Sequence, residues 1–140
     1  MRKEILLTGF GGQGLILAGI LMAESAVLYQ GLNATQNQAY GIEVRGGECR
    51  SEVILSDAPI HHADVDAPDV LLCMSQMAFD KFAPMVKAGA LVVIATLLVE
   101  DTGKLKPGSL LKSYPITAIC SQATGQTIMA NLPALGILAQ

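Results

Sequence analysis

The amino-acid sequence predicts an α/β fold, a three-layer α/β/α sandwich around a mostly parallel or mixed sheet. Short apolar segments typical of buried strands alternate with longer segments typical of helices, which favours this fold class. The first strand is followed by a glycine-rich turn and a helix, as in a Rossmann-like β-loop-α unit. At 140 residues, the chain has the length of one domain with a substantial core.

The elements of the N-terminal half follow from local patterns. Residues 4–8 (EILLT) indicate a buried strand, and residues 9–14 (GFGGQG) indicate the turn after it. Residues 13–30 predict a helix with apolar residues on nearly every face, so we expect this helix to be buried. Two more strands are expected, a polar one at residues 33–38 and another at residues 50–56, before a turn at residues 57–60.

The C-terminal half continues the alternation of strands and helices. Apolar runs that begin just after Pro68 and Gly89 predict strands. The expected order is a strand at 70–74, a helix at 76–87, a strand at 90–95, a surface connection at 101–109, a last strand at 114–119 and a helix from 127 onward.

Charged residues are scarce and unevenly distributed. They make up 15% of the chain, against about 25% in an ordinary soluble domain. Glu24 is the only charge between residues 5 and 42, and residues 113–140 carry none. Buried parallel strands would explain this composition, and so would a surface that is covered by other subunits. The net charge of −3 and the lack of a basic cluster argue against nucleic-acid binding.

Several other classes of protein are disfavoured. The longest apolar stretch, residues 15–23, is far shorter than the ~20 residues of a membrane span, and no signal peptide is evident, so we expect a cytoplasmic chain. Three scattered cysteines without a C-x-x-C spacing indicate buried side chains, and this chain alone should not ligate an iron–sulfur cluster. His61 and His62 are interpreted as exposed loop residues, because neighbouring side chains on a strand would point to opposite faces.

The glycines of GFGGQG fit the dinucleotide-binding pattern G-x-G-x-x-G. Such turns present backbone N–H groups and a helix N-terminus to phosphate. Binding of NAD also needs an acidic residue about 20 positions further on, and that region reads GLNATQNQ, which argues against a nicotinamide cofactor. Two alternatives remain open, a purely structural turn or contact with a phosphate of another ligand. The candidate ligand contacts are Gly9, Gly11, Gly12, Gln13 and Gly14.

A second group of candidates lies in the segment QNQAYGIEVRGG. Its residues of interest are Tyr40, Glu43, Arg45, Gly46 and Gly47. A Glu–Arg pair at this spacing is often only a surface ion pair, whereas the guanidinium fork also suits carboxylate or phosphate recognition. Gln76 is a further candidate, because it follows a predicted strand where open α/β sheets place ligands; the alternative is a helix start with Ser75 as the N-cap.

These segments together resemble a known family. GFGGQGLILAG, QNQAYGIEVRGG with SEVILS, PDVLLCMSQ and NLPALG are similar to the gamma subunit, or gamma domain, of 2-oxoacid:ferredoxin oxidoreductases. The resemblance covers nearly the whole chain. The form of the second segment is most like the 2-oxoglutarate branch, and pyruvate or branched-chain 2-oxoacids remain alternatives.

The resemblance implies one part of a larger enzyme. In this family thiamine diphosphate lies between the alpha and beta parts, and iron–sulfur clusters are ligated outside the gamma part, in some members by a ferredoxin-like subunit. The complex converts a 2-oxoacid and coenzyme A to an acyl-CoA and CO2 and reduces ferredoxin. By itself this chain should bind no cofactor and no metal and should not be catalytic. Its glycine turn and Gln76 should lie near coenzyme A, and an isolated chain should self-associate.

Some residues depart from the family pattern. Ile42 stands where the family often has proline. The proline that the family often has a few residues after Pro59-Ile60 is absent, and His61-His62-Ala63 stands there, which leaves the path of that loop open. Family members usually continue beyond the position of Gln140, so we expect residues 1–140 to be a single gamma-type domain that is truncated at its C-terminus. A rival interpretation is a free-standing nucleotide- or phosphate-binding regulatory α/β domain.

Overall fold

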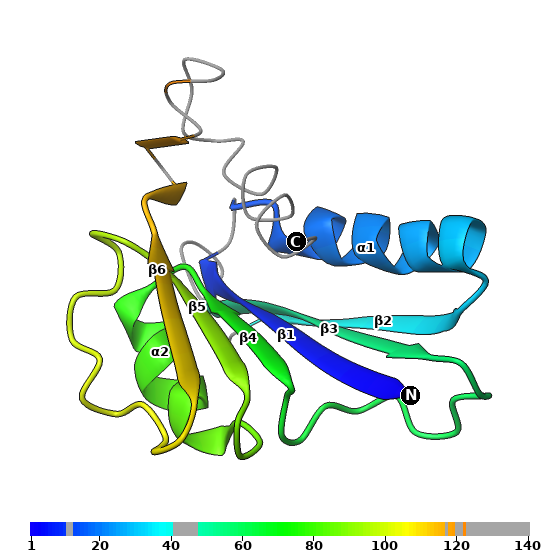
Figure 1. Ribbon diagram of the computed structural model, residues 1–140. Coiled ribbons are helices and arrows are strands. Elements are labelled where there is room, and N and C mark those ends of the chain that lie inside the picture. The colour runs from blue at the N-terminus through cyan, green and yellow to red at the C-terminus, as the bar shows by residue number, and fades with distance from the viewer. Residues whose placement is uncertain (11–12, 41–47, 117, 120–121, 123–140) are drawn as a thin grey trace.

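A mixed sheet forms the middle layer of the protein, with the strand order β2-β3-β1-β4-β5-β6 (Figure 1). The computed structural model describes residues 1–10, 13–40, 48–116, 118–119 and 122. The strands are β1 (Arg2–Phe10), β2 (Asn33–Tyr40), β3 (Glu48–Ser56), β4 (Val70–Cys73), β5 (Leu91–Ala95) and β6 (Leu110–Tyr114). Strands β1, β4, β5 and β6 run parallel, while β3 is antiparallel to both β1 and β2.

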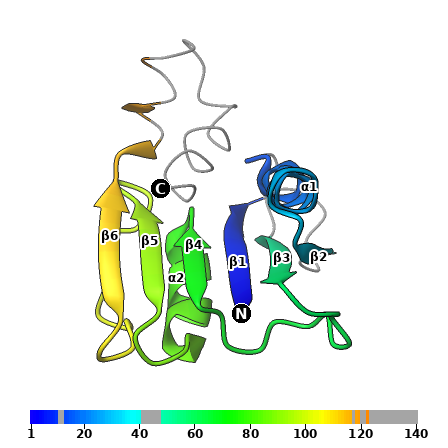
Figure 2. The same cartoon turned by 45° about the vertical axis from the view of Figure 1, so that its right-hand side comes forward.

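Helices on opposite faces of the sheet complete the three layers. Helix α1 (Leu15–Gln30) covers β1, β2 and β3, and helix α2 (Gln76–Phe82) lies on the other face near β1 and β4 (Figure 2). Alternate residues of a strand point to opposite faces. Leu7 therefore packs in the core on the α1 side, and its neighbour Leu6 packs in the core on the α2 side. The predicted α/β sandwich is confirmed.

Close packing of α1 on the sheet depends on a glycine. A Cβ atom at Gly19 would overlap the Ser51 hydroxyl and lie 3.1 Å from Ser51 Cβ, so only glycine lets the helix backbone approach β3 this closely. At the helix ends, Gly14 and Gly31 have left-handed φ angles of 75° and 65°. Glycine reaches this region without the steric cost that other residues incur.

The prediction that α1 is buried was wrong for its outer face, which is exposed. Leu17, Leu28 and Tyr29 are exposed to 52%, 73% and 85%. A helix that is apolar all round is expected to be covered, but the described part of the chain covers one face of α1 only. The charge-poor sequence of this helix therefore produces an apolar surface as well as a core.

Two element boundaries also differ from the predictions. The helix expected at 76–87 ends at Phe82 and is followed by a 3-10 turn, η1 (Ala83–Met85), because Pro84 has no N–H to continue the α-helical pattern. The last strand, expected at 114–119, is β6, which ends at Tyr114. Pro115 then starts a helical turn in which Ile119 N–H donates to the Pro115 carbonyl. The helix expected from residue 127 lies outside the described residues.

Candidate functional site

The carboxyl ends of β1, β4 and β5 form one edge of the sheet, at the top in Figure 2. Open α/β sheets bind ligands at this edge, where strand-to-helix connections meet. The connection after β1 contains the glycine-rich turn, and the connection after β4 leads through Ser75 to Gln76. The structure thus brings Gly9, Gln13 and Gly14, the described candidates of the glycine-rich turn, and Gln76 to the same edge of the sheet.

Gln13 closes the glycine-rich turn with its side-chain amide. Its Oε1 accepts a hydrogen bond from Phe10 N–H at 2.7 Å, and its Nε2 donates to the Met74 carbonyl at 3.1 Å. One amide therefore ties the end of β1 to the residue that follows β4. Because both of its polar atoms are already engaged, Gln13 acts on any ligand by positioning the turn.

The structure explains why glycine stands at positions 9 and 14 of the turn. A Cβ at Gly9 would overlap Gln13 Oε1 and would lie 2.9 Å from Met74 Cβ, so the folded-back amide needs a glycine beneath it. Gly14 precedes α1 in the left-handed conformation and offers no side-chain cap. Among the described residues, Gly14 thus provides no side-chain cap for the first N–H groups of α1. Gly11 and Gly12 lie outside the described residues.

Gln76 has a similar fixing role in the next connection. Its Oε1 accepts from the N–H groups of Glu100 and Asp101 at 2.9 and 3.0 Å. Its Nε2 donates to the Asp101 carbonyl at 2.7 Å and to the Asp80 carboxylate at 3.0 Å. Ser75 is the N-cap of α2 and accepts from Ala78 N–H, as the structural interpretation predicts. The amide of Gln76 is thereby saturated within the chain.

The second predicted group begins and ends beside the glycine-rich turn. Tyr40, the last residue of β2, pairs with Cys49, and Cys49 pairs with Gly9. Glu48, the first residue of β3, pairs with Phe10. The other predicted residues of this group, Glu43, Arg45, Gly46 and Gly47, lie outside the described residues, as does the side chain of Tyr40. Their proposed roles stay predictions.

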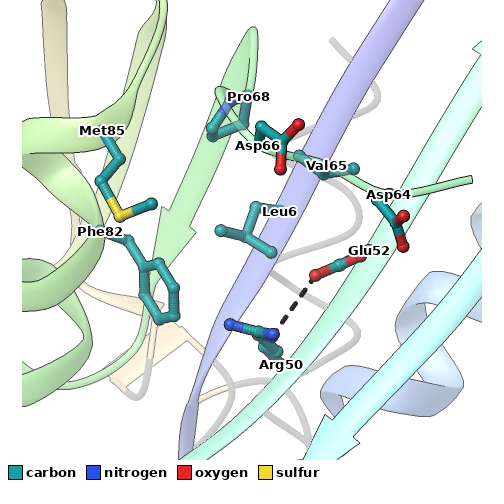
Figure 3. A pocket seen from close by; sticks show the side chains of 9 residues that line it. All are labelled: Leu6, Arg50, Glu52, Asp64, Val65, Asp66, Pro68, Phe82 and Met85. Carbon is teal, nitrogen blue, oxygen red and sulfur yellow. Dashed lines mark ion pairs between the residues drawn. The ribbon is translucent and has the colours of Figure 1, made fainter.

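A pocket on the α2 face is a feature that sequence reasoning missed. It has a volume of about 280 Å³ and lies among β1, β3, the 57–69 connection and the end of α2 (Figure 3). Its lining residues are Leu6, Arg50, Glu52, Asp64, Val65, Asp66, Pro68, Phe82 and Met85. They come from four separate chain segments, so local sequence patterns carry no signal for this pocket.

The guanidinium of Arg50 contacts the side chains of Glu52 and Phe82. Its Nε lies 3.4 Å from a Glu52 oxygen, which is an ion-pair distance, but the two atoms are not aligned as a hydrogen bond. The guanidinium lies 5.7 Å from the centre of the Phe82 ring, within cation–π range. Because of these contacts, substitution of Arg50 should disturb its local surroundings.

The thiols in the described residues do not suit metal or redox chemistry. Burial raises the pKa of the Cys73 thiol to about 12, although Thr8 Oγ1 contacts its sulfur at 3.6 Å. Burial also raises the pKa of Cys49. An iron–sulfur cluster needs four thiolates or close substitutes, and the described residues include only these two cysteines. His61 and His62 are exposed, and within the described ranges no three His, Cys, Asp or Glu side chains gather as a metal site requires.

The architecture defines an α/β domain with a Rossmann-like first unit and a glycine-rich connection at the carboxyl ends of its parallel strands. More specifically, the chain belongs to the pyruvate ferredoxin/flavodoxin oxidoreductase family, whose model matches residues 4–140. Within the described residues, neither helix combines the length and hydrophobicity of a membrane span.

Similar proteins are subunits of oxidoreductases. The 2-oxoglutarate synthase subunit KorC of Methanocaldococcus jannaschii is 44% identical over 99% of this chain and 74% of that protein. The ketoisovalerate oxidoreductase subunit VorA of Methanothermobacter thermautotrophicus is 30% identical over 96% of this chain but only 27% of that protein. The crystal structure of a keto/oxoacid ferredoxin oxidoreductase gamma subunit from Geobacter sulfurreducens has a TM-score of 0.83 and 40% identity, covering 99% of this chain and 74% of that one.

Proposed function

We propose that this chain is the accessory gamma subunit of a 2-oxoacid:ferredoxin oxidoreductase, with 2-oxoglutarate as the substrate of the complex. The observation that carries this proposal is the 44% identity with a 2-oxoglutarate synthase subunit over 99% of the chain. The reaction would be thiamine-dependent oxidative decarboxylation, in which a 2-oxoacid and coenzyme A give an acyl-CoA, CO2 and reduced ferredoxin. The chain would work in the cytoplasm with alpha, beta and ferredoxin-like subunits.

The cofactor chemistry would belong to the partner subunits. The described residues fit an iron–sulfur cluster poorly, because no three His, Cys, Asp or Glu side chains gather among them and a cluster needs four ligands. Thiamine diphosphate and the clusters would supply carbanion and electron-transfer chemistry from the other subunits. This chain would bind coenzyme A, position it and shield it from water.

For coenzyme A, we propose a site at the glycine-rich turn. The open N–H groups at the start of α1 suit a phosphate, because the helix N-terminus carries partial positive charge. Gln13 and Gln76 would hold the two flanking connections in place through the hydrogen bonds described above. The direct contacts with coenzyme A predicted for Gly9, Gly11, Gly12 and Gly14 remain part of this proposal, whereas Gln13 and Gln76, also predicted as contacts, would act by positioning because their amides are engaged within the chain.

Arg45 would be the most important charge of the interface or ligand site. It follows residues 5–42, in which Glu24 is the only charge, and Glu43 two positions earlier could hold its guanidinium in place. Arg45→Ala should lower assembly or acyl-CoA formation by orders of magnitude, because loss of one partner of a shielded charge pair costs about 3 to 5 kcal/mol. Lys112, an exposed residue of β6, is the matched control. Equal results for Arg45→Ala and Lys112→Ala would leave Arg45 as an ordinary surface residue.

The function itself is tested by reconstitution. The full-length chain is co-expressed with the alpha, beta and ferredoxin-like subunits of its native enzyme, purified through a tag, and assayed for coenzyme A-dependent ferredoxin reduction. We expect co-purification and the highest kcat/KM with 2-oxoglutarate among 2-oxoglutarate, pyruvate and branched-chain 2-oxoacids. A monomeric chain that captures no thiamine-dependent partner would instead favour a free-standing phosphate-binding domain.

A further inference from the structure

The connection after β5 holds an apolar side chain outward in a strained backbone conformation. Leu97 has a φ of 73°, the left-handed region, and it is the one described non-glycine residue with positive φ. Its side chain is 78% exposed. Bulky residues in this region are uncommon and persist where the surrounding structure fixes them, often at functional sites.

The turn around Leu97 is fixed on both sides. Leu98 N–H and Val99 N–H both donate to the Ala95 carbonyl, at 3.2 and 3.0 Å, and Thr96 N–H donates to the Tyr114 carbonyl at 2.8 Å. Thr96 Oγ1 also lies 2.8 Å from Ser113 Oγ.

Packing directs the neighbouring side chains inward. Leu98 packs against the core on the α1 side, and Val99 is buried in the core on the α2 side. Gln76 then holds Glu100 and Asp101, as described above. Hydrogen bonds or packing thus hold Thr96, Leu98 and Val99, while the side chain of Leu97 is exposed.

From this arrangement we infer that Leu97 is an anchor residue that inserts into an apolar depression on a partner subunit of the same enzyme. The inference rests on the proposed function, which supplies that partner. Leu97 lies at the carboxyl edge of the sheet, and Met77, exposed to 58% in the first turn of α2, adds apolar surface at the same edge.

The chemistry of this part of the edge favours a protein partner over a phosphate ligand. Between Thr96 and Gly103 the charged side chains are Glu100 and Asp101, both acidic, and this stretch contains no lysine or arginine. An anionic ligand would be repelled there, whereas an exposed leucine gains free energy by leaving water for an apolar surface. The 27% coverage of the VorA subunit shows that a domain of this family also occurs within a much longer chain, where more polypeptide is available to pack against it.

Substitutions at Leu97 separate docking from folding. Asparagine tolerates the left-handed region better than leucine, so Leu97→Asn should leave the melting temperature of the isolated chain unchanged or raise it by a few degrees. The same change should weaken the apparent Kd for the co-purified partner subunits by about tenfold or more. Leu97→Met keeps an apolar side chain and should stay within about threefold of wild type.

The control is another exposed leucine. Leu110 is 55% exposed at the first residue of β6, at the opposite edge of the sheet, so Leu110→Asn should leave assembly unchanged. Equal assembly of wild type and Leu97→Asn overturns the inference while the proposed function stands. A raised KM for coenzyme A with unchanged assembly also overturns it and makes Leu97 a ligand contact. A wild-type chain that assembles with no partner overturns both proposals.

Discussion

At the scale of single residues, Gln13 shows how one amide can hold a ligand-binding turn in place. Replacement by glutamate keeps an acceptor for Phe10 N–H but removes the donor to the Met74 carbonyl and places two oxygens against each other. We expect Gln13→Glu to lower the free energy of unfolding by about 1 to 3 kcal/mol, measured by urea denaturation at neutral pH. Gln38→Glu, an exposed site on β2, is the control and should be nearly neutral.

Gly9 is the steric counterpart of Gln13. Gly9→Ala introduces a Cβ that would overlap Gln13 Oε1 and crowd Met74 Cβ at 2.9 Å, so we expect a loss of about 2 kcal/mol. Gly31→Ala tests conformation alone, because Gly31 has a φ of 65° and open space around it; about 1 kcal/mol is expected there. If thermal unfolding shows Gly9→Ala to be no worse than Gly31→Ala, the overlap is relieved by movement of Gln13.

The roles of the two glutamines illustrate what the sequence could not predict. The glycine pattern indicated a short connection between a strand and a helix, and the structure has β1 ending at Phe10 and α1 beginning at Leu15. The partners of Gln13 and Gln76 include Met74 and Asp101, which lie 61 and 25 residues away in the chain. Such contacts follow from strand order and not from local spacing. A polar residue at this edge therefore appeared free for a ligand although the fold already uses its hydrogen bonds.

At the scale of elements, one charged network joins the starts of β1, β4 and β5. The Asp69 carboxylate accepts from Glu4 N–H at 2.9 Å and from Lys87 Nζ at 3.1 Å, and Lys87 Nζ lies 3.5 Å from Glu4. Burial acts to raise the pKa of Asp69, but the Glu4 hydrogen bond and Lys87 outweigh it, so the pKa is lowered. Burial likewise acts to lower the pKa of Lys87, and the two carboxylates raise it overall.

This network makes stability depend on pH in a defined direction. Because the folded pKa of Asp69 is lowered, its contribution is present above about pH 4 and is lost as the pH falls through the folded pKa. The raised pKa of Lys87 makes its contribution complete below about pH 10 and lost as the pH rises through the folded value.

Asp69→Asn should test the acid limb of this dependence. We expect it to cost about 1 kcal/mol at neutral pH, a modest value because Lys87 is 41% exposed. The deficit should shrink as urea denaturation is repeated in steps down to about pH 3, where the wild-type carboxylate takes up a proton. A deficit of equal size at every pH would show that packing, and not charge, sets the effect.

Element boundaries were predictable where a turn-forming residue marked them and uncertain where two patterns competed. β1, β4 and β5 were predicted to within a few residues, because parallel strands buried on both faces give continuous apolar runs. The last strand was placed too late, since the apolar residues after Pro115 resemble a strand as much as a helical turn. Pairing of Leu110 through Tyr114 with β5 decides the register, and the local sequence does not contain that information.

At the scale of the whole molecule, the shortage of charge goes with a buried sheet and with an exposed apolar face on α1. The central strands are buried on both faces, as Leu71, Leu72, Val92 and Val93 show. The outer face of α1 nevertheless exposes several large apolar side chains, and Glu24 is the only charge in that helix. Sequence composition could signal too little polar surface for a free monomer, but it could not say which surface lacks it, because that depends on how α1 packs.

The outer face of α1 predicts the behaviour of the isolated chain. Without its partner subunits, exposed apolar surface should drive self-association, because contact between two such faces removes both from water. We expect the isolated chain to be colourless and to sediment as oligomers that dissociate on dilution. Leu17 and Leu28 are 52% and 73% exposed on α1, so Leu17→Glu combined with Leu28→Glu should shift the chain toward monomer without lowering its melting temperature. The paired control is Glu24→Gln, which keeps the apolar surface and should leave association intact. A strictly monomeric wild type at high concentration would show that this face is too small or too well hydrated to bind another apolar surface.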